Sequence, residues 1–248
     1  TGFNVKNIFK IKLNKRIIAR LDIKGPNLIK GINFEGLRKL GNPNDFAIKY
    51  YVEEVDEILF MDNVASLYGR NSLFDVIKRS TEQIFVPITV GGGIRNLSDV
   101  EKILKSGADK VAINSAAISN PDLISQISKT FGSQCLVISI EAKKTNEQSW
   151  EAYVHNGRDK TGLDVMDWSK KCVDLGAGEI FVTSIDQDGT FKGFDNLLND
   201  KISKNLNIPL VIGGGLGSLE NLDLIKINQN INGLSIGSAL HYNKIKIK

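Results

Sequence analysis

The stretch that decides the fold is a run of three glycines that the chain contains twice. It reads "VGGGIR" at residues 90–95 and returns as "IGGGLG" at residues 212–217. Glycine is poorly suited to the interior of a helix or strand, because its backbone loses the most conformational freedom on folding. Each run follows a short apolar stretch, which indicates a strand that ends in a glycine-built turn.

Short apolar stretches alternate with amphipathic stretches along the whole chain. Segments such as "LSDVEKILKSGA" (97–108) and "NPDLISQISKTFGS" (120–133) carry apolar residues at helical spacing. Strands that are apolar throughout and separated by helices are typical of a parallel sheet buried on both faces. The predicted strands are residues 16–23, 57–62, 86–92, 110–114, 135–142, 179–186, 209–215 and 233–237.

The second half of this pattern repeats the first. Glu179 minus Glu57 is 122, and Gly213 minus Gly91 is also 122. Two similar halves of four strand–helix units predict an α/β fold, a (β/α)8 TIM barrel with an internal two-fold half-barrel repeat. We expect one domain over residues 1–248, with residues 1–14 as a candidate extension and a closing helix that is short or missing, because few residues follow the last strand.

Composition excludes several classes of function. Hydrophobic residues make up 42% and charged residues 24% of the chain, which is ordinary globular usage. The net charge of +4 is scattered, so no nucleic-acid partner is expected. Cys135 and Cys172 lack the spacing of a metal site or disulfide framework and predict two free thiols in the cytoplasm. No apolar run reaches the roughly 20 residues that span a membrane. The sequence implies no metal and no organic cofactor.

The doubled glycine run also predicts a function. A glycine run after a strand lets the backbone approach an anion and present several N–H groups. Each run is followed in the next unit by a serine-bearing turn, "INSAA" (113–117) and "IGSAL" (236–240). A single run is equally consistent with a simple tight turn. Two glycine runs at equivalent positions of the two halves predict two phosphate sites on opposite sides of the barrel mouth, and hence a substrate with phosphate at both ends.

Two carboxylates lie near the ends of opposite strands. Asp22 ends the first apolar strand and Glu141 ends the fifth, and these strands face each other across an eight-stranded barrel. A carboxylate there is costly to bury without a partner or a task. We predict acid and base roles, while each residue could instead cap a loop or pair with Lys24 or Lys143.

Further polar residues lie near the predicted mouth. Lys30, in the glycine-flanked loop "KGPNLIKGINF" (24–34), could reach a phosphate or could be an exposed lysine without a role. Asp188 follows the sixth strand in "SIDQDGT" (184–190), where Asp-Gly is also ordinary turn chemistry. His155 and His241 are not expected to be catalysts.

The motifs "KRIIARLDIK" (15–24), "PITVGGGIR" (87–95), "GADKVAINSAA" (107–117) and "LGAGEIFVTSIDQDGTFKGFD" (175–195) resemble the cyclase subunit of imidazole glycerol phosphate synthase. The similarity extends over about residues 15–241. It implies a (β/α)8 fold that uses ammonia from a separate glutaminase subunit. The implied reaction converts a bis-phosphorylated ribulosyl formimino carboxamide nucleotide into imidazole glycerol phosphate and aminoimidazole carboxamide ribotide, in histidine biosynthesis.

The resemblance also implies residue roles. Asp22 and Glu141 take the places of two essential acid–base carboxylates. A charged ring at the bottom of the barrel gates ammonia entry in the family, and a glutaminase would dock on that amino face near Asp109. The counterparts of the ring are Arg16, Glu57, Lys110 and Glu179, which could equally form a simple salt-bridge ring. The counterparts of the phosphate-binding turns are Gly92, Gly93, Asn114, Ser115, Gly189, Gly214, Gly215, Gly237 and Ser238.

The chain departs from the family pattern in three places. Glu141 stands where the family has Asp, Arg20 stands where it usually has Cys, and the loop at 62–72 adds Tyr68 and Arg70. These changes resemble a paralogous branch that delivers ammonia for amidation of a surface-polysaccharide sugar. A third alternative is a catalytically silent scaffold that activates a glutaminase.

Overall fold

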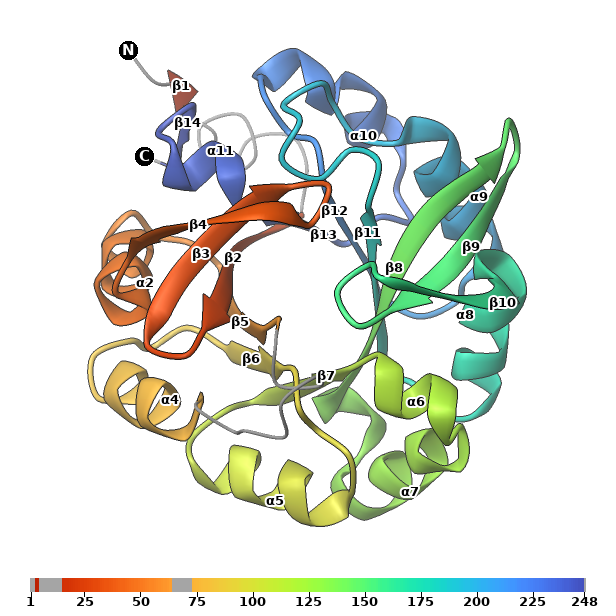
Figure 1. Ribbon diagram of the computed structural model, residues 1–248, viewed down its shortest axis with the longest axis horizontal. Helices are drawn as coiled ribbons and strands as arrows, with labels where there is room; N and C mark the ends of the chain where they lie inside the picture. The colour runs from red at the N-terminus through yellow and green to blue at the C-terminus, as the bar shows by residue number, and fades with distance from the viewer. Residues whose placement is uncertain (1–2, 5–14, 64–72, 248) are drawn as a thin grey trace.

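The centre of the structure is a closed parallel barrel, shown end-on in Figure 1. The structure is a computed structural model that describes residues 3–4, 15–63 and 73–247. β13 pairs with β2, with Leu234 opposite Ile17, and this pairing closes the ring. The predicted (β/α)8 barrel is therefore confirmed. Its strands are β2 (Arg16–Lys24), β5 (Glu57–Asp62), β6 (Ile88–Gly91), β7 (Lys110–Ile113), β8 (Leu136–Asn146), β11 (Glu179–Ser184), β12 (Leu210–Gly213) and β13 (Gly233–Ile236).

Helices surround the barrel on its outer side. Side-chain caps set several helix starts, as at Asn96, whose oxygen accepts the Asp99 N–H, and at Asp195, whose carboxylate accepts the Leu198 N–H. The two amphipathic segments named above form α5 and α7. The helices are α2 (Pro43–Val52), α4 (Leu73–Thr81), α5 (Leu97–Lys105), α6 (Ser115–Ser119), α7 (Asp122–Phe131), α8 (Val165–Asp174), α9 (Asn196–Asn205), α10 (Asp223–Ile227) and α11 (Ser238–His241), with 3-10 turns η1 (Ser133–Cys135) and η2 (Leu219–Leu222).

Strand alternation divides the buried side chains into two sets. On β2, Ile17 and Leu21 belong to the large core between strands and helices. Ile18, between them, belongs to a separate apolar layer inside the barrel, because successive side chains of a strand face opposite sides. This inner layer consists of Ile18, Leu59, Ala112, Val137, Phe181 and Val211.

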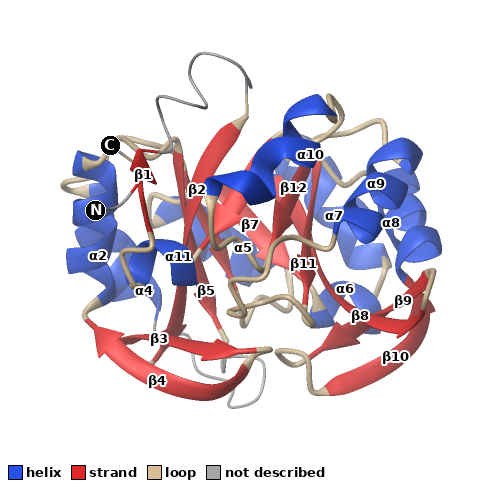
Figure 2. Ribbon diagram, turned by 90° about the horizontal axis from the view of Figure 1, so that it is seen from above, coloured by secondary structure: helices blue, strands red, loops and turns tan. Residues whose placement is uncertain are grey.

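Two hairpins at the carboxyl face were not predicted. β3 (Asn27–Ile32) and β4 (Glu35–Gly41) follow β2, while β9 (Ser149–Val154) and β10 (Asp159–Asp164) follow β8. Figure 2 shows both hairpins beside each other at one end of the barrel. Each follows the first strand of its half, so the half-barrel similarity extends to them. β2 and β8 consequently continue past Asp22 and Glu141, because their ends pair with β3 and β9.

The two ends of the described chain lie together. β1 (Phe3–Asn4) pairs in parallel with β14 (Ile245–Lys246), beside α11 (Figure 1). Within the described ranges, none of the helices has the length and apolar character needed to cross a membrane.

Candidate active site

The two glycine runs form matching turns at the carboxyl ends of β6 and β12. Gly92 and Gly214 have φ of +96° and +95°, values that favour glycine. A Cβ on Gly92 would lie 2.3 Å from the Asp62 carbonyl oxygen, and one on Gly215 would lie 2.0 Å from that of Gly193. The runs are therefore required by close backbone contact as well as by backbone conformation.

The next turn in each half also repeats. Asn114 has φ −129° and ψ −84°, and Gly237 has φ −114° and ψ −84°, so the backbone enters α6 and α11 in the same way. Asn114 Oδ1, Ser235 Oγ and Ser238 Oγ are buried and have no hydrogen-bond partner within the described part of the chain. Buried polar atoms without partners are rare, and several at one mouth indicate where a ligand binds.

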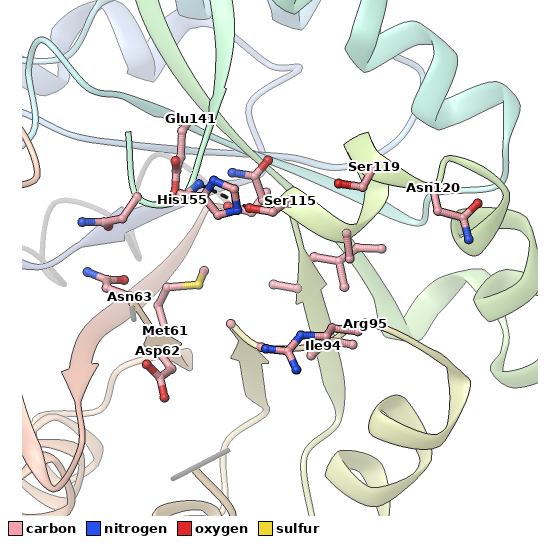
Figure 3. Close-up of a pocket in the computed structure, with 18 residues that line it drawn as sticks. Met61, Asp62, Asn63, Ile94, Arg95, Ser115, Ser119, Asn120, Glu141 and His155 are labelled. Atoms are coloured by element: carbon pink, nitrogen blue, oxygen red, sulfur yellow. Dashed lines mark hydrogen bonds between the residues drawn. The ribbon is translucent and has the colours of Figure 1, made fainter. Parts of the chain in front are cut away.

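The mouth contains two cavities of different size. The larger has a volume of about 320 Å³ (Figure 3) and the smaller about 20 Å³. The predicted phosphate-binding residues divide between them. Gly92, Gly93, Asn114 and Ser115 line the larger cavity, whereas Gly189, Gly214, Gly215, Gly237 and Ser238 line the smaller.

Asp22 lies in a buried network of charges. Its Oδ1 accepts a hydrogen bond from Arg20 Nε at 2.8 Å, and its Oδ2 accepts one from Lys30 Nζ at 2.8 Å. Lys30 Nζ also lies 3.0 Å from Asp188 Oδ2. Burial alone would favour the protonated acid, but Arg20 and Lys30 outweigh it and hold the pKa of Asp22 well below its ordinary value. Asp22 is therefore an ionised carboxylate at every physiological pH.

Lys30 was expected in a loop and instead lies on β3. Its side chain is 2% exposed and reaches Asp22 and Asp188 rather than solvent. Burial lowers the pKa of the amine, but attraction to Asp188 and Asp22 outweighs it and the pKa is raised. The strand position results from pairing with β4, which residues 24–34 do not themselves encode.

Glu141 differs from Asp22 in both contacts and ionisation. Its Oε2 accepts the Gly157 N–H at 2.7 Å, and the side chain lines the larger cavity beside His155 (Figure 3). Burial raises the pKa of Glu141 to about 7, although the Gly157 N–H, Arg20 and Asn114 oppose the rise. Two carboxyl groups with well-separated pKa values are the arrangement that acid–base chemistry at neutral pH requires.

The four residues of the predicted ring meet at the amino ends of their strands. Arg16 Nη1 lies 2.8 Å from Glu57 Oε2, and Arg16 Nη2 lies 2.5 Å from Glu179 Oε1. Lys110 Nζ lies 3.0 Å from both Glu57 and Glu179. The two bases and two acids thus alternate around the lumen.

A cavity of about 10 Å³ lies above this ring, bounded mainly by the inner apolar layer. That volume is close to the space that one water-sized molecule needs. Asp109, expected at the docking face, accepts the Ile88 N–H at 2.8 Å at the amino ends of the strands.

Three residues near the mouth have roles that were not predicted from the sequence: Arg20 was named only as a departure from the family pattern, Arg95 was not singled out, and His155 was not expected to be a catalyst. Arg20 faces the lumen, which strand alternation from Asp22 could have revealed. Arg95 and His155 line the larger cavity. His155 Nδ1 contacts Asp159 Oδ2 at 2.8 Å across the β9–β10 turn, a contact created by the unpredicted hairpin.

Other residues named from the sequence have structural places. Burial lowers the pKa of His241 to about 3, and its Nδ1 lies 2.7 Å from the Tyr50 hydroxyl. Asp186, in the segment "SIDQDGT" (184–190) that holds Asp188, accepts the Lys144 N–H at 2.8 Å. Tyr68 and Arg70 lie outside the described residues. Within the described ranges, no group of three or more His, Cys, Asp or Glu side chains is placed to hold a metal ion.

Comparison with known proteins gives this geometry a family. The chain matches the family described as histidine biosynthesis protein over residues 16–246. It is 58% identical to the imidazole glycerol phosphate synthase subunit HisF of Legionella pneumophila, over 84% of this chain and 98% of that relative. The chain belongs to the HisF family.

Two further HisF proteins match nearly the whole chain. The protein of Hydrogenobaculum sp. (strain Y04AAS1) is 48% identical over 95% of this chain and 93% of the relative. That of Streptococcus mutans is 43% identical over 95% of this chain and 94% of the relative. The resemblance seen in the sequence motifs is thereby confirmed, including its extent along the barrel.

Proposed function

We propose that this HisF-family chain is the ammonia-using cyclase of histidine biosynthesis. It would convert the bis-phosphorylated ribulosyl formimino carboxamide nucleotide into imidazole glycerol phosphate and aminoimidazole carboxamide ribotide. The observation that carries the proposal is the pair of glycine-built cavities at the barrel mouth, the larger lined by Glu141 and the smaller by Arg20, which donates to Asp22. The relatives named imidazole glycerol phosphate synthase subunit HisF support it.

In this proposal each cavity binds one phosphate of the substrate. The backbone turns at Gly92–Gly93 and Gly214–Gly215 approach the phosphates closely, as glycine turns do in other anion sites. Asn114 and Ser115 bind one phosphate, and Gly189, Gly237 and Ser238 bind the other. Lys30 and Asp188 border the second site and set its charge.

The chemistry requires addition of ammonia to the imine-bearing substrate, elimination and ring closure. Each step moves a proton. Glu141 can both accept and donate at neutral pH, because burial raises its pKa to about 7. Asp22 remains ionised and stabilises positive charge on the attacking nitrogen.

Ammonia would enter through the amino face of the barrel. Arg16, Glu57, Lys110 and Glu179 close that entrance as a ring of ion pairs. The apolar layer above it offers a route for a small neutral molecule and disfavours ammonium. A glutaminase subunit docked near Asp109 and Lys110 would supply the ammonia, and we place this heterodimer in the cytoplasm, with the other histidine-biosynthesis reactions.

A second candidate rests on the active-site substitutions. Glu141 is one methylene longer than the Asp of the family pattern, and a displacement of about 1 Å in a reacting group can cost about a hundredfold in rate. Arg20 adds a buried charge beside Asp22. Both favour a paralog that delivers ammonia for amidation of a surface-polysaccharide sugar, whereas a silent scaffold would not need the two binding turns.

Ammonium-dependent turnover of the bis-phosphorylated substrate by the isolated, folded chain tests the proposal. We expect turnover that falls at least about a hundredfold in Asp22→Asn, since this variant removes the carboxylate charge. Asp200→Asn is the matched control, because this half-exposed carboxylate lies on α9 and its only ion pair among the described residues is with Lys204. A folded chain that binds the substrate without turnover would refute the cyclase assignment, and coupling to a glutaminase would then favour the second candidate.

A further inference from the structure

Arg20 occupies the boundary between the barrel lumen and the mouth. It follows Ile18 and precedes Asp22 on the inward face of β2, so its side chain lies above the inner apolar layer. The residue is 5% exposed and also borders the smaller cavity. A charged side chain buried to this degree requires specific partners.

The guanidinium has such partners on three elements. Nε donates to Asp22 Oδ1 at 2.8 Å on β2, and Nη1 donates to Thr183 Oγ1 at 3.1 Å on β11. Its Cζ lies 5.5 Å from the ring centroid of Phe34 at the β3–β4 turn and 5.6 Å from that of Phe181 in the apolar layer. Both distances are within the range of cation–π contacts. These contacts leave the planar group one orientation.

This orientation determines what Asp22 can do. Each oxygen of Asp22 receives a charged donor, one from Arg20 and one from Lys30. Thr183, Phe34 and Phe181 contact the guanidinium of Arg20 independently of Asp22. The carboxylate is therefore held in place through Arg20 rather than by β2 alone.

Arg20 also approaches Glu141, because Thr183, which accepts the Arg20 Nη1 hydrogen bond, lies opposite Glu141 in the parallel pairing of β11 with β8. The charge of Arg20 lowers the pKa of Glu141, against the larger effect of burial, which raises it. Asp22 has the opposite effect on Glu141. Asp62, Arg95 and His155 line the larger cavity together with Glu141, and Tyr153 on β9 pairs with Glu141. The charged or titratable groups on other elements around Asp22 are Lys30, Asp188 and His241.

We propose that Arg20 is a positioning residue that fixes the ionised carboxylate of Asp22 in one orientation and supplies part of the electrostatic field in which Glu141 exchanges protons. The two carboxyl groups consequently do different work, one as a fixed charge and one as a proton carrier. This inference rests on the proposed function for its catalytic consequence, but its electrostatic part is testable without substrate.

Carbon-13 NMR of glutamate carboxyl groups tests the electrostatic part. The Glu141 signal, assigned with Glu141→Gln, should titrate near pH 7 in the parent chain. In Arg20→Met its midpoint should rise by about one pH unit, because an attractive positive charge is lost. In Arg20→Lys, which keeps the charge, the midpoint should stay at the parent value. An unchanged midpoint in Arg20→Met would overturn this part of the inference.

Ammonium-dependent kinetics test the positioning. Arg20→Lys should lower kcat about tenfold or more and leave the titration midpoint of Glu141 and the substrate KM unchanged. The reason is that lysine lacks the planar guanidinium that hydrogen-bonds Asp22 and Thr183 at the same time. If Arg20→Lys and Arg20→Met both had the kcat of the parent chain, the positioning role would be refuted and Arg20 would contribute only to packing. Absence of turnover in the parent chain would refute the proposed function, and the NMR titration would still decide the electrostatic part.

Thr183→Val tests the same inference if the Arg20→Met chain does not fold. Thr183→Val removes the acceptor of the Nη1 hydrogen bond and keeps the side-chain shape and the Arg20 charge. It should lower kcat and leave the Glu141 midpoint unchanged. A folded Thr183→Val chain with parent kcat would contradict the positioning role.

Discussion

Replacement of Glu141 by glutamine tests the raised proton affinity of this carboxyl group through the stability of the fold. A carboxyl whose folded pKa is raised stabilises the fold at low pH and loses that contribution as pH rises through the folded value. The difference between an ordinary 4.5 and about 7 corresponds to about 3 kcal/mol of unfolding free energy. Solvent in the adjoining cavity screens the half-buried group, so we expect about 2 kcal/mol between pH 5 and pH 8.

Glu141→Gln removes the ionisation and retains an oxygen that can accept the Gly157 N–H. Relative to the parent chain, the variant should therefore gain about 2 kcal/mol in unfolding free energy as pH rises from 5 to 8. Urea denaturation at each pH measures this difference. Glu147→Gln, on the exposed turn after β8, is the control and should show no such trend. A pH-independent difference for Glu141→Gln would refute the reasoning about its environment.

Three further predictions concern other parts of the molecule. Gly92→Ala should weaken binding of the bis-phosphorylated substrate at least about tenfold, measured by calorimetry, because the added Cβ would lie 2.3 Å from a carbonyl oxygen. Gly162→Ala is the control and should bind the substrate normally, because Gly162 also has a positive φ but no atom of the described residues close to the added Cβ. Arg16→Ala opens the ring at the amino face, so it should change glutamine-dependent turnover by the complex with a glutaminase and leave ammonium-dependent turnover by the isolated chain unchanged. A parallel loss of both activities would contradict a gate. The two cysteines should resist a thiol reagent in the native chain and react after denaturation, because Cys135 and Cys172 are buried and burial raises the pKa of Cys172 to about 12. Rapid reaction of the native chain would contradict their burial.

The barrel was predictable because its signals are local. Apolar runs of strand length and helical periodicity located all eight barrel strands, within a few residues at their ends. The hairpins β3–β4 and β9–β10 were missed, because their strands alternate weakly and are stabilised by pairing with the extended ends of β2 and β8. Lys30 was consequently expected in a loop, although it is buried on β3.

The sequence by itself determined the eight-unit barrel, the two glycine turns and the residue types at the strand ends, because backbone preference and periodicity act over a few neighbouring residues. Only the tertiary structure decided the ionisation and contacts of the mouth. Lys30 meets Asp188 across 158 positions of sequence, and Arg20 meets Thr183 across 163. Hydrogen bonds and pKa values depend on distances of a few ångströms between such distant segments, and closing the barrel is what sets those distances.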